Sequence, residues 1–549
     1  MTEPAALQAQ RRAVAALRAA LGAELVETHI SFVLIDRVHA WKIKKAIDLG
    51  FADFRSLAQR RFYADEELRL NRRTAPQLYL QVLPLTGTPA APHIGGDGAA
   101  FDWVLQMRAF DQAGLWDRLA ARGALGAAQV DALVEPLCAL HAAADVAGAH
   151  SRYGTPAQLR APMSDNLRVL ARSCRDADER ATLRQLHDWE AQAFAALHDA
   201  FQQRHAAGFV RENHGDLHLG NVTQIDGEPV LFDCLEFSAE LRWTDVASDA
   251  AFMAMDLQAH GLEALAQRFV NAWIEHSGDV GALRVLRYYR VHRALVRAKV
   301  AALRWQQLAG GDTDAAAVDA DADAARAQLR RYLGLAQRCS VPAAPVLLLT
   351  HGLSGSGKTA ATQGLLEASG AIRFRADVER KRLFGLHALQ RGDAAQQARL
   401  YAEAAHRATL QRLLDHAELA LQSGYPVILD ATFLAADARQ QARGLAARLG
   451  AGFVILHFAA RPETLRARVR RRAARGDDAS DADLAVLEAQ LRQAQALGAA
   501  EADAVIVVDA DAELDDPAAP ARWLPLAPQL AAHGVSLATG AGWQNPPST

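Results

Sequence analysis

The sequence is poor in cysteine and has no long hydrophobic run. Its 549 residues include four scattered cysteines, which are Cys138, Cys174, Cys234 and Cys339. Their spacing fits neither a metal site nor a disulfide framework, so it favours a reducing compartment, the cytoplasm. The first residues lack the apolar core of a signal peptide, and no apolar run reaches about 18 residues, so we expect no membrane span.

Net charge and aromatic content are also low. The formal net charge is −3, and aromatic residues make up 6% of the chain. No overall field attracts nucleic acid or a membrane surface, and no series of aromatic residues for base stacking stands out. Nucleic acid is therefore an alternative partner rather than the favoured one. A hydrophobic content of 51% is typical of globular chains, and the length predicts two to four domains.

A change of composition divides the chain near residue 340. A Gly, Asp and Ala-rich stretch begins at Gly310, and Pro342 and Pro345 follow a short helical pattern. We predict a first domain over residues 1–308, a linker with a short helix over 309–344, a second domain over 345–531 and a tail over 532–549. We expect the tail to be poorly ordered. The sequence does not indicate an oligomeric state.

An acid and an amide lie five residues apart in the stretch HGDLHLGNV, residues 214–222. They are Asp216 and Asn221, and Asp233 follows in the apolar run VLFD. This spacing is typical of the catalytic loop and metal strand of kinase-like phosphotransferases. Mg²⁺ needs oxygen ligands, which Asn221 and Asp233 can supply, while Asp216 is left for the acceptor hydroxyl. The competing interpretation is a His- and Gly-rich turn between two strands.

Two lysines occupy one face of a predicted strand. Residues 28–45 predict two strands joined by a turn, and Lys42 and Lys44 share a face of the second strand because side chains alternate. Kinase-like folds hold the α- and β-phosphates with a strand lysine braced by a helix glutamate. Glu66 and Glu67 of the following helix are the candidate partners. We favour Lys44 for the phosphates over Lys42, and a solvated basic strand is the alternative.

Helical spacing between residues 126 and 308 predicts a helical lobe, joined to the small sheet lobe by a hinge near residues 111–114. Asp245 and Asp249 lie one helical turn apart near the start of one of these helices. They are candidates to brace the catalytic loop, and a solvated helical turn is the simpler alternative.

The stretch at residues 214–222, together with LFDCLEF at residues 231–237, resembles the aminoglycoside phosphotransferase and choline kinase family. The resemblance covers about residues 25–305 and implies an α+β, protein-kinase-like bilobal domain. It also implies that Asp216 is the base and that Asn221 and Asp233 bind Mg²⁺. The family contains kinases for antibiotics, sugars, choline and amino acids, so the resemblance does not set the substrate.

Residues 352–359 read GLSGSGKT, which is a complete P-loop motif. An apolar strand precedes it and a helix ending at Gly370 follows, which is the context that supports this motif. Backbone N–H groups and the helix N-terminus would hold the β-phosphate. Lys358 would reach the β- and γ-phosphates, and Thr359 would bind Mg²⁺. The other candidate phosphate-binding residues are Gly352, Ser354, Gly355, Ser356 and Gly357.

Asp377 and Arg380 follow a short predicted strand and are three residues apart. On a helix these side chains share a face, so the acid could meet an acceptor hydroxyl while the arginine holds an anionic part of the acceptor. The alternative is that Asp377 only caps the helix.

The second half contains two further candidates for binding Mg-ATP. Asp430 ends the next strand and resembles a Walker-B acid, which supports the Mg²⁺ shell. A basic segment at residues 461–475 could form an arginine lid, with Arg468 and Arg472 as candidates for phosphate contact. A solvated basic helix face is the alternative for most of these arginines.

Residues 345–512 resemble the small P-loop kinases, a group that includes polynucleotide 5′-kinase, gluconate kinase and zeta-toxin-like enzymes. The resemblance implies an α/β P-loop NTPase domain with a five-stranded parallel sheet. Together the two halves predict a bifunctional, cytoplasmic kinase that uses ATP and Mg²⁺ to phosphorylate a hydroxyl of a small molecule. The alternatives are a polynucleotide or nucleotide end kinase, a regulatory nucleotide switch with one inactive half, and an aminoglycoside-modifying enzyme.

Overall fold

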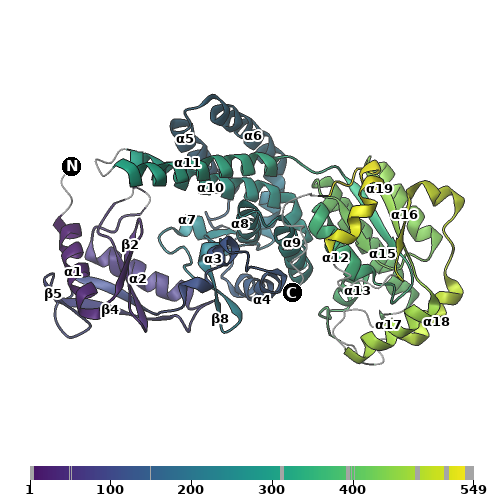
Figure 1. Cartoon of the computed structure of the whole chain (residues 1–549), viewed down its shortest axis with the longest axis horizontal. Coiled ribbons are helices and arrows are strands. Elements are labelled where there is room, and N and C mark those ends of the chain that lie inside the picture. Colours follow the sequence, from purple (N-terminus) through teal and green to yellow (C-terminus); the bar gives the residue numbers. More distant parts are fainter. Residues whose placement is uncertain are drawn as a thin grey trace. The chain divides into compact units, whose positions relative to one another are not determined.

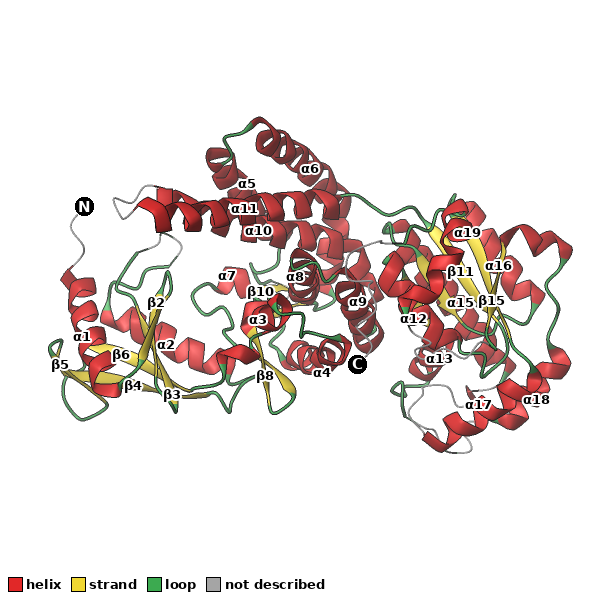
Figure 2. Ribbon diagram, in the orientation of Figure 1, coloured by secondary structure: helices red, strands yellow, loops and turns green. Residues whose placement is uncertain are grey.

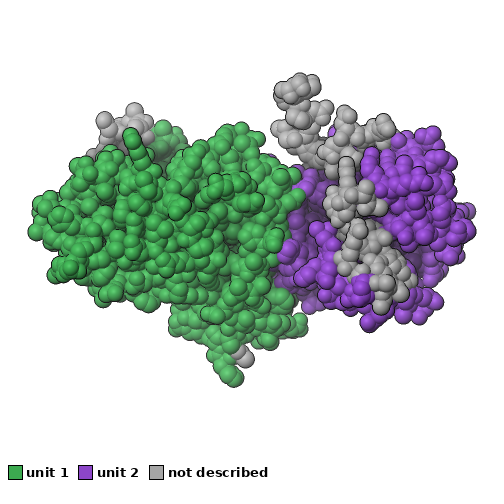
Figure 3. Space-filling view, turned by 90° about the horizontal axis from the view of Figure 1, so that it is seen from below, with its two compact units in different colours: residues 1–260, 288–336 green, residues 261–287, 337–549 purple. Residues whose placement is uncertain are grey.

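The chain forms two compact units, coloured separately in Figure 3. The computed structural model describes residues 5–309 except 49, 51 and 149, residues 315–475 except 391–392, 394–395, 397–398 and 401, and residues 482–511 and 519–537. The first unit comprises residues 1–260 and 288–336, and the second comprises residues 261–287 and 337–549. The units therefore interleave along the chain, and residues 261–287 group with the second unit although we placed them in the first domain.

The first unit begins with a six-stranded antiparallel sheet in the order β1-β2-β3-β6-β4-β5 (Figure 2). Helix α1 (Ala5–Leu21) packs on one face through Val14 and Leu17, which contact the core around Phe32 and Ile43. Helix α2 (Leu57–Asn71) packs against β4 and β6. The predicted hairpin at residues 28–45 is confirmed as β2 and β3. The strands are β1 (Glu24–Glu27), β2 (Ser31–Ile35), β3 (His39–Lys44), β4 (Tyr79–Thr88), β5 (Ala91–Ile94) and β6 (Asp102–Arg108).

A helical lobe completes the first unit and confirms the predicted bilobal architecture (Figure 1). Its helices are α3 (Trp116–Ala121), α4 (Ala127–Ala143), α5 (Pro156–Ser173), α6 (Ala177–Ala206), α7 (Ala239–Arg242), α8 (Val246–Ala259), and the parts of α10 (Leu283–Ala309) and α11 (Ala315–Ser340) that lie within residues 288–336. Two small antiparallel sheets pair β7 (Val210–Glu212) with β10 (Trp243–Asp245) and β8 (Val222–Ile225) with β9 (Glu228–Leu231).

Helix α8 is buried on almost every side. Of its residues, Gln258 is the one that is not buried. A helix that is apolar all round belongs in a core, and the polar residues it carries there need hydrogen-bond partners. Asp249 and Asp256 are its buried acids, at 0% and 1% exposure, and they find those partners in the catalytic loop.

The predicted linker helix is longer and more embedded than expected. It is the 26-residue α11, and its residues up to 336 belong to the first unit. Leu329 and Tyr332 are buried, at 0% and 2% exposure, so this part of the helix contributes to a core. Residues 310–314, where the predicted linker begins, lie outside the described part of the chain.

The second unit confirms the predicted five-stranded parallel sheet, with strand order β12-β13-β11-β14-β15. The central β11 is buried on both faces, as strands of a covered parallel sheet are. The strands are β11 (Val346–His351), β12 (Ile372–Arg375), β13 (Val427–Asp430), β14 (Gly452–Ala459) and β15 (Val505–Asp509). The helices include α9 (Glu263–Ser277), α12 (Lys358–Ser369), α13 (Ala376–Leu383), α15 (Glu403–Gln422), α16 (Ala436–Arg448), α17 (Pro462–Arg475), α18 (Leu484–Gln493) and α19 (Ala527–Ala532).

Part of the predicted tail is packed rather than poorly ordered. Val535 is 2% exposed and joins the core formed by Val346, Leu348 and Trp523. Burial of this apolar side chain holds the first residues after α19 in place. The sequence did not indicate this, because the segment is rich in small and polar residues. Residues 538–549 of the predicted tail lie outside the described residues. None of the described helices is long and apolar enough to cross a membrane.

Helix α9 covers the edge strand of the parallel sheet. The Asn271 side chain donates a hydrogen bond to Ala371 O at 3.0 Å and accepts one from Arg373 N at 2.8 Å. It therefore satisfies backbone groups that flank β12 and that a further strand would otherwise bind. Ion pairs of 2.7 Å between Arg268 and Glu367 and of 3.3 Å between Arg375 and Glu275 support the contact. Residues 261–287 thus contribute an integral layer of the second unit.

We expect the substitution Asn271→Asp to loosen this edge. It keeps the shape of the side chain but replaces the donor that faces Ala371 O with a second acceptor. A buried polar group left unpaired costs about 1–3 kcal/mol, so amides of β12 should exchange with solvent on the order of ten- to a hundredfold faster. Hydrogen–deuterium exchange mass spectrometry measures this directly. His276→Ala, at an exposed position of the same helix, is the control. Unchanged exchange in Asn271→Asp would show that the edge does not depend on this side chain.

Candidate active sites

Two buried carboxylates and one arginine fix the catalytic loop of the first unit. Asp249 accepts hydrogen bonds from His214 N at 2.9 Å and Gly215 N at 3.0 Å, and Asp256 accepts one from Leu219 N at 3.0 Å. Arg293 donates to Gly215 O at 2.9 Å. Backbone donors and acceptors of the loop are thereby satisfied by α8 and α10, which leaves the loop little freedom to move.

The bracing role expected of Asp249 is therefore confirmed, and the alternative of a solvated helical turn is wrong. Asp245 is also buried, but it contacts Arg204 at 2.5 and 2.8 Å and caps α8 through Ala247 N. It joins α6 to α8 instead of holding the loop.

Two residues of the site have left-handed backbone conformations. Gly215 has φ +83°, and a Cβ there would lie 3.1 Å from Arg242 Cα, which explains why glycine stands where protein kinases have arginine. Asp233 has φ +61°, a conformation that costs a non-glycine residue free energy and that is concentrated at functional sites. A hydrogen bond from Asp233 N to the Tyr79 hydroxyl, 3.1 Å long, helps to hold it.

Asp216, Asn221 and Asp233 lie together. Asn221 Nδ2 donates to Asp216 O at 2.8 Å and to Asp216 Oδ2 at 3.3 Å. The backbone O of Asn221 accepts from Phe232 N at 3.0 Å, which pairs Asn221 with the residue before Asp233, and Asp216 lies close enough to Asp233 to act on its pKa. The side chains of Asp216 and Asp233 are 36% and 40% exposed, so both carboxylates can be reached from solvent.

Neighbouring cations keep Asp216 ionised. Burial alone would raise the pKa of Asp216, but His218, Arg297 and His214 hold that pKa well below its ordinary value. So strong an acid would be able to orient a hydroxyl and would accept its proton late. This suits phosphoryl transfer, in which positioning matters more than early proton removal.

Two lysines and three carboxylates form a buried ionic cluster beside this loop. Lys42 Nζ lies 2.6 Å from Glu67 Oε1 and 2.7 Å from Asp233 Oδ1. Lys44 Nζ lies 2.5 Å from Glu67 Oε2 and also forms an ion pair with Glu236. Burial would lower the pKa of Lys42, but Asp233 and Glu67 hold that pKa well above its ordinary value, so the ammonium stays charged. The alternative of a solvated basic strand is therefore wrong, because both lysines are held in ion pairs within this cluster.

The geometry favours Lys42 for the phosphates, the reverse of our preference for Lys44. Lys42 faces the candidate metal ligand Asp233, whereas Lys44 is 3% exposed and faces Glu236. Glu67 is the glutamate that both lysines contact. Glu66 instead pairs with Arg69 at 2.8 Å and Arg242 at 3.1 Å.

The oxygen donors of the first site fit Mg²⁺. Asn221 uses its Nδ2 for Asp216, which leaves its Oδ1 for an ion, and the Asp233 carboxylate is half exposed. Among the described residues no cluster of three or more His, Cys, Asp and Glu side chains could hold a metal ion. An ion here would therefore depend on the amide of Asn221 and on oxygens of the nucleotide as well as on Asp233.

The P-loop of the second unit needs its glycines. Gly355 and Gly357 have φ values of +87° and +78°. A Cβ on Gly355 would lie 2.9 Å from Leu465 O and 3.0 Å from Val469 Cγ2, because α17 lies against the loop. The N-terminus of α12 begins at Lys358, so the helix points its free N–H groups at the loop.

Lys358 is turned onto its own loop. Its Nζ donates to Gly352 O and Leu353 O, both at 2.9 Å, and to Ser356 Oγ at 3.3 Å. Burial lowers the pKa of Lys358 to about 8, although Asp430 and Asp377 oppose the shift. Both acids therefore lie near the lysine that we assign to the phosphates.

Asp430 and Asp377 differ in their surroundings. Asp430 is 5% exposed, and its Oδ2 is buried without a hydrogen-bond partner among the described residues, which fits an ion or a water ligand. Asp377 accepts from Arg380 Nη1 at 3.0 Å, so these two side chains share a helix face as expected. Asp377 lies inside α13, whose N-cap is Arg375, and the capping alternative is not observed.

The two lid arginines also differ. Arg472 donates to Ala482 O at 2.6 Å and lies close enough to lower the pKa of Lys358. Arg468 donates to Ala510 O at 2.7 Å and acts on Arg522 instead. Arg472 is thus the one that faces the P-loop.

Gln490 of α18 is a contact that sequence reasoning missed. Its side-chain oxygen accepts a hydrogen bond from Ser354 N at 2.9 Å. The two residues are 136 positions apart, so no local pattern could indicate the contact.

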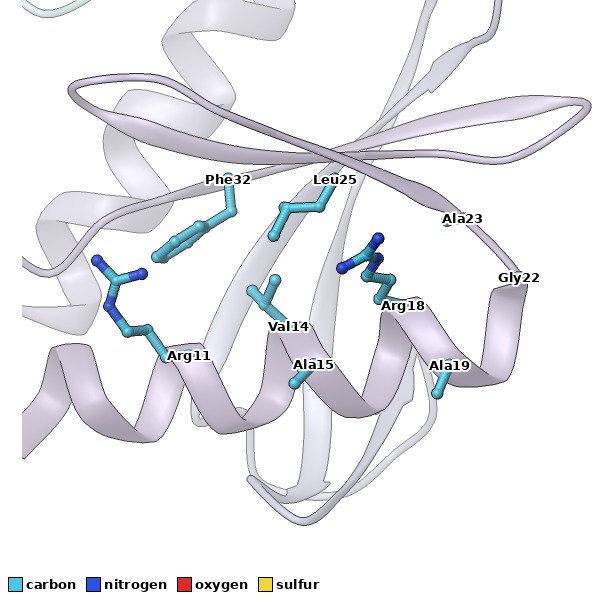
Figure 4. Close-up of a pocket in the computed structure, with 9 residues that line it drawn as sticks. All are labelled: Arg11, Val14, Ala15, Arg18, Ala19, Gly22, Ala23, Leu25 and Phe32. Carbon is cyan, nitrogen blue, oxygen red and sulfur yellow. The ribbon is translucent and has the colours of Figure 1, made fainter. Parts of the chain in front are cut away.

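A groove of about 430 Å³ lies away from all of these residues, between α1 and the β1–β2 hairpin (Figure 4). Val14, Leu25 and Phe32 form its apolar floor, and Arg11 and Arg18 also line it. It contains none of the candidate site residues.

Comparisons with known proteins found a family model and several similar solved structures. The model of a family described as an AAA domain matches residues 347–497. A choline/ethanolamine kinase family protein from Mesorhizobium loti is 14% identical, with a TM-score of 0.35, over 60% of this chain and 99% of its own. A gluconokinase from Sinorhizobium meliloti 1021 is 18% identical, with a TM-score of 0.25, over 34% of this chain and 97% of its own.

Relatives that span both units also exist. The uncharacterized protein Rv2004c of Mycobacterium tuberculosis and the uncharacterized protein Mb2027c of Mycobacterium bovis are each 30% identical to this chain over 464 residues. The alignments cover 84% of this chain and 89% of each relative. The chain therefore belongs to the same family as these mycobacterial proteins.

Proposed function

We propose that this protein is a bifunctional ATP-dependent kinase with one Mg-ATP site in each unit. Each site would transfer the γ-phosphoryl group to a hydroxyl of a small molecule. The observation that carries the proposal is the contact of 2.7 Å between Lys42 and Asp233, which joins a candidate phosphate ligand to a candidate metal ligand 191 positions away. It forms beside the loop that presents Asp216.

In the first unit each residue has a distinct task. Asn221 and Asp233 would hold Mg²⁺, which when bound shields the charge of the phosphates. Lys42, held by Glu67, would bind the phosphate oxygens. Asp216 orients the acceptor hydroxyl, whose oxygen forms the new bond to phosphorus as the bond to the leaving diphosphate breaks, and it receives the hydroxyl proton.

In the second unit the P-loop supplies most of the phosphate contacts. Loop amides and Lys358 would hold the β- and γ-phosphates, and Thr359 and Asp430 would support Mg²⁺. Asp377 would orient the acceptor hydroxyl, with Arg380 beside it. Arg472 is the lid residue placed to add positive charge.

Single substitutions should separate the two sites. We expect Asp216→Asn to lower transfer by the first site about 10²–10⁴-fold, the usual contribution of a positioned acid–base group. Lys358→Ala should remove transfer by the second site alone, and the double variant should remove both. ADP release from Mg-ATP, measured with a small-molecule extract as the acceptor source, tests this. Asp226→Asn is a matched control, because Asp226 is an exposed turn residue with φ +52°, which asparagine tolerates. Full ATP consumption in the double variant would contradict the proposal.

Nucleotide affinity of the second site should fall above pH 8. The empty loop holds Lys358 with a pKa of about 8, and phosphate oxygens favour the charged ammonium, so binding requires the protonated form. Affinity should be flat below pH 8 and then fall by up to about tenfold per pH unit. A fluorescent ATP analogue, titrated into the Asp233→Asn variant to silence the first site, measures this. Lys358→Arg stays charged and should remove the dependence. A constant affinity up to pH 9.5 without that substitution would count against Lys358 as a phosphate ligand.

A further inference from the structure

A histidine and an arginine lie next to Asp216. His218 Nε2 lies 3.5 Å from Asp216 Oδ2, and Arg297 Nη1 lies 3.4 Å from the same His218 nitrogen. The His218 ring nitrogen thus lies between the guanidinium of Arg297 and the carboxylate of Asp216, which would orient the acceptor. Arg297 comes from α10, outside any motif that the sequence displays.

The tautomer of His218 shows that Arg297 has no acceptor there. His218 Nδ1 accepts a hydrogen bond from Gly220 N at 3.1 Å, so this nitrogen keeps its lone pair and carries no proton. The ring proton of a neutral His218 is then on Nε2, which faces Asp216. A protonated Nε2 has no lone pair to offer, so the contact of 3.4 Å from Arg297 Nη1 is a close approach and not a hydrogen bond.

Arg297 is also without a carboxylate partner in the described structure. Its other contacts are with Tyr332: Nε lies 3.4 Å from the hydroxyl, and the guanidinium carbon lies 5.7 Å from the centre of the ring. The side chain is half-buried, and a guanidinium in that position has five donors to satisfy. Partial removal of a guanidinium from water costs free energy unless an anion lies next to it. The site therefore favours a ligand that carries an anionic group.

Asp256 and Asp216 help to raise the pKa of Arg297 from a distance, but among the described residues neither carboxylate forms an ion pair with it. Asp256 is buried and already accepts from Leu219 N at 3.0 Å and from the Tyr332 hydroxyl at 3.2 Å. Asp117 lies on the Gly220 side of the loop, 3.8 Å from where a Cβ of Gly220 would be. A cationic acceptor at Asp216 would meet Arg297 and His218, with Asp117 as its one nearby carboxylate besides Asp216 among these residues.

We propose that the acceptor of the first unit carries an anionic group, a carboxylate or a phosphate, near the hydroxyl that is phosphorylated, and that Arg297 binds this group. The inference rests on the proposed function of Asp216. Asp216 orients the hydroxyl while the guanidinium fork of Arg297 receives two oxygens of the anion. A polycationic acceptor such as an aminoglycoside is disfavoured by the same charges.

The first test separates acceptors by charge. The full chain with Lys358→Ala, which silences the second site, is incubated with labelled Mg-ATP and a cellular small-molecule extract split by ion exchange into anionic, neutral and cationic fractions. We expect product in the anionic fraction and none when Asp216→Asn is added. Asp216-dependent product confined to the neutral or cationic fraction would overturn the inference and leave the proposed function standing. No Asp216-dependent product in any fraction would overturn both.

The second test concerns Arg297 itself. With the active fraction, Arg297→Met should raise the KM for the acceptor on the order of ten- to a hundredfold, the loss expected for a hydrogen-bonded charge pair, with a smaller change in kcat. Arg297→Lys should recover part of the loss. Arg304→Met, at an exposed position of the same helix, is the matched control. An equal loss of affinity for Mg-ATP and for the acceptor in Arg297→Met would assign the residue a structural role and overturn the inference.

Discussion

The first unit depends on the burial of Glu67 between two lysines. Its carboxylate is fully buried and contacts Lys42 and Lys44 at 2.6 and 2.5 Å. Removing one partner of such a buried pair leaves an uncompensated charge and typically costs 3–5 kcal/mol. Through Lys42 the cluster reaches Asp233, so an ion pair joins the sheet lobe to the strained segment that follows β9 in the helical lobe. The catalytic loop is then fixed from its other side by the buried acids of α8.

Local motifs made the fold and the positions of the candidate sites predictable, whereas contacts between residues distant in sequence could not be predicted. The stretches HGDLHLGNV and GLSGSGKT each place several roles within a few residues, and the structure brings those residues together as the spacing suggested. The sequence could not indicate which lysine and which glutamate form the ion pair. Lys42 and Lys44 lie on the same strand face, and Glu66 and Glu67 are adjacent on one helix, so only the packing of the strand against the helix decides which of them meet. No sequence pattern indicated the contacts of Glu236 and Gln490, because these contacts join residues that are far apart in the chain.

The interleaved units alter how the chain is divided. Sequence composition indicated a break near residue 340, yet α9 contributes an edge layer to the parallel sheet through Asn271. A fragment that begins at the P-loop strand would leave the β12 edge uncovered, and an exposed edge strand favours aggregation. Assigning activity to each unit therefore requires substitutions in the whole chain in place of isolated halves.

We propose that one chain carries two separate Mg-ATP sites, one built on Asn221 and Asp233 and one on the P-loop around Lys358. Equilibrium dialysis at saturation measures directly how many molecules of a non-hydrolysable Mg-ATP analogue bind to each chain. We expect two molecules per chain. A value of one for the intact chain would contradict the presence of two sites.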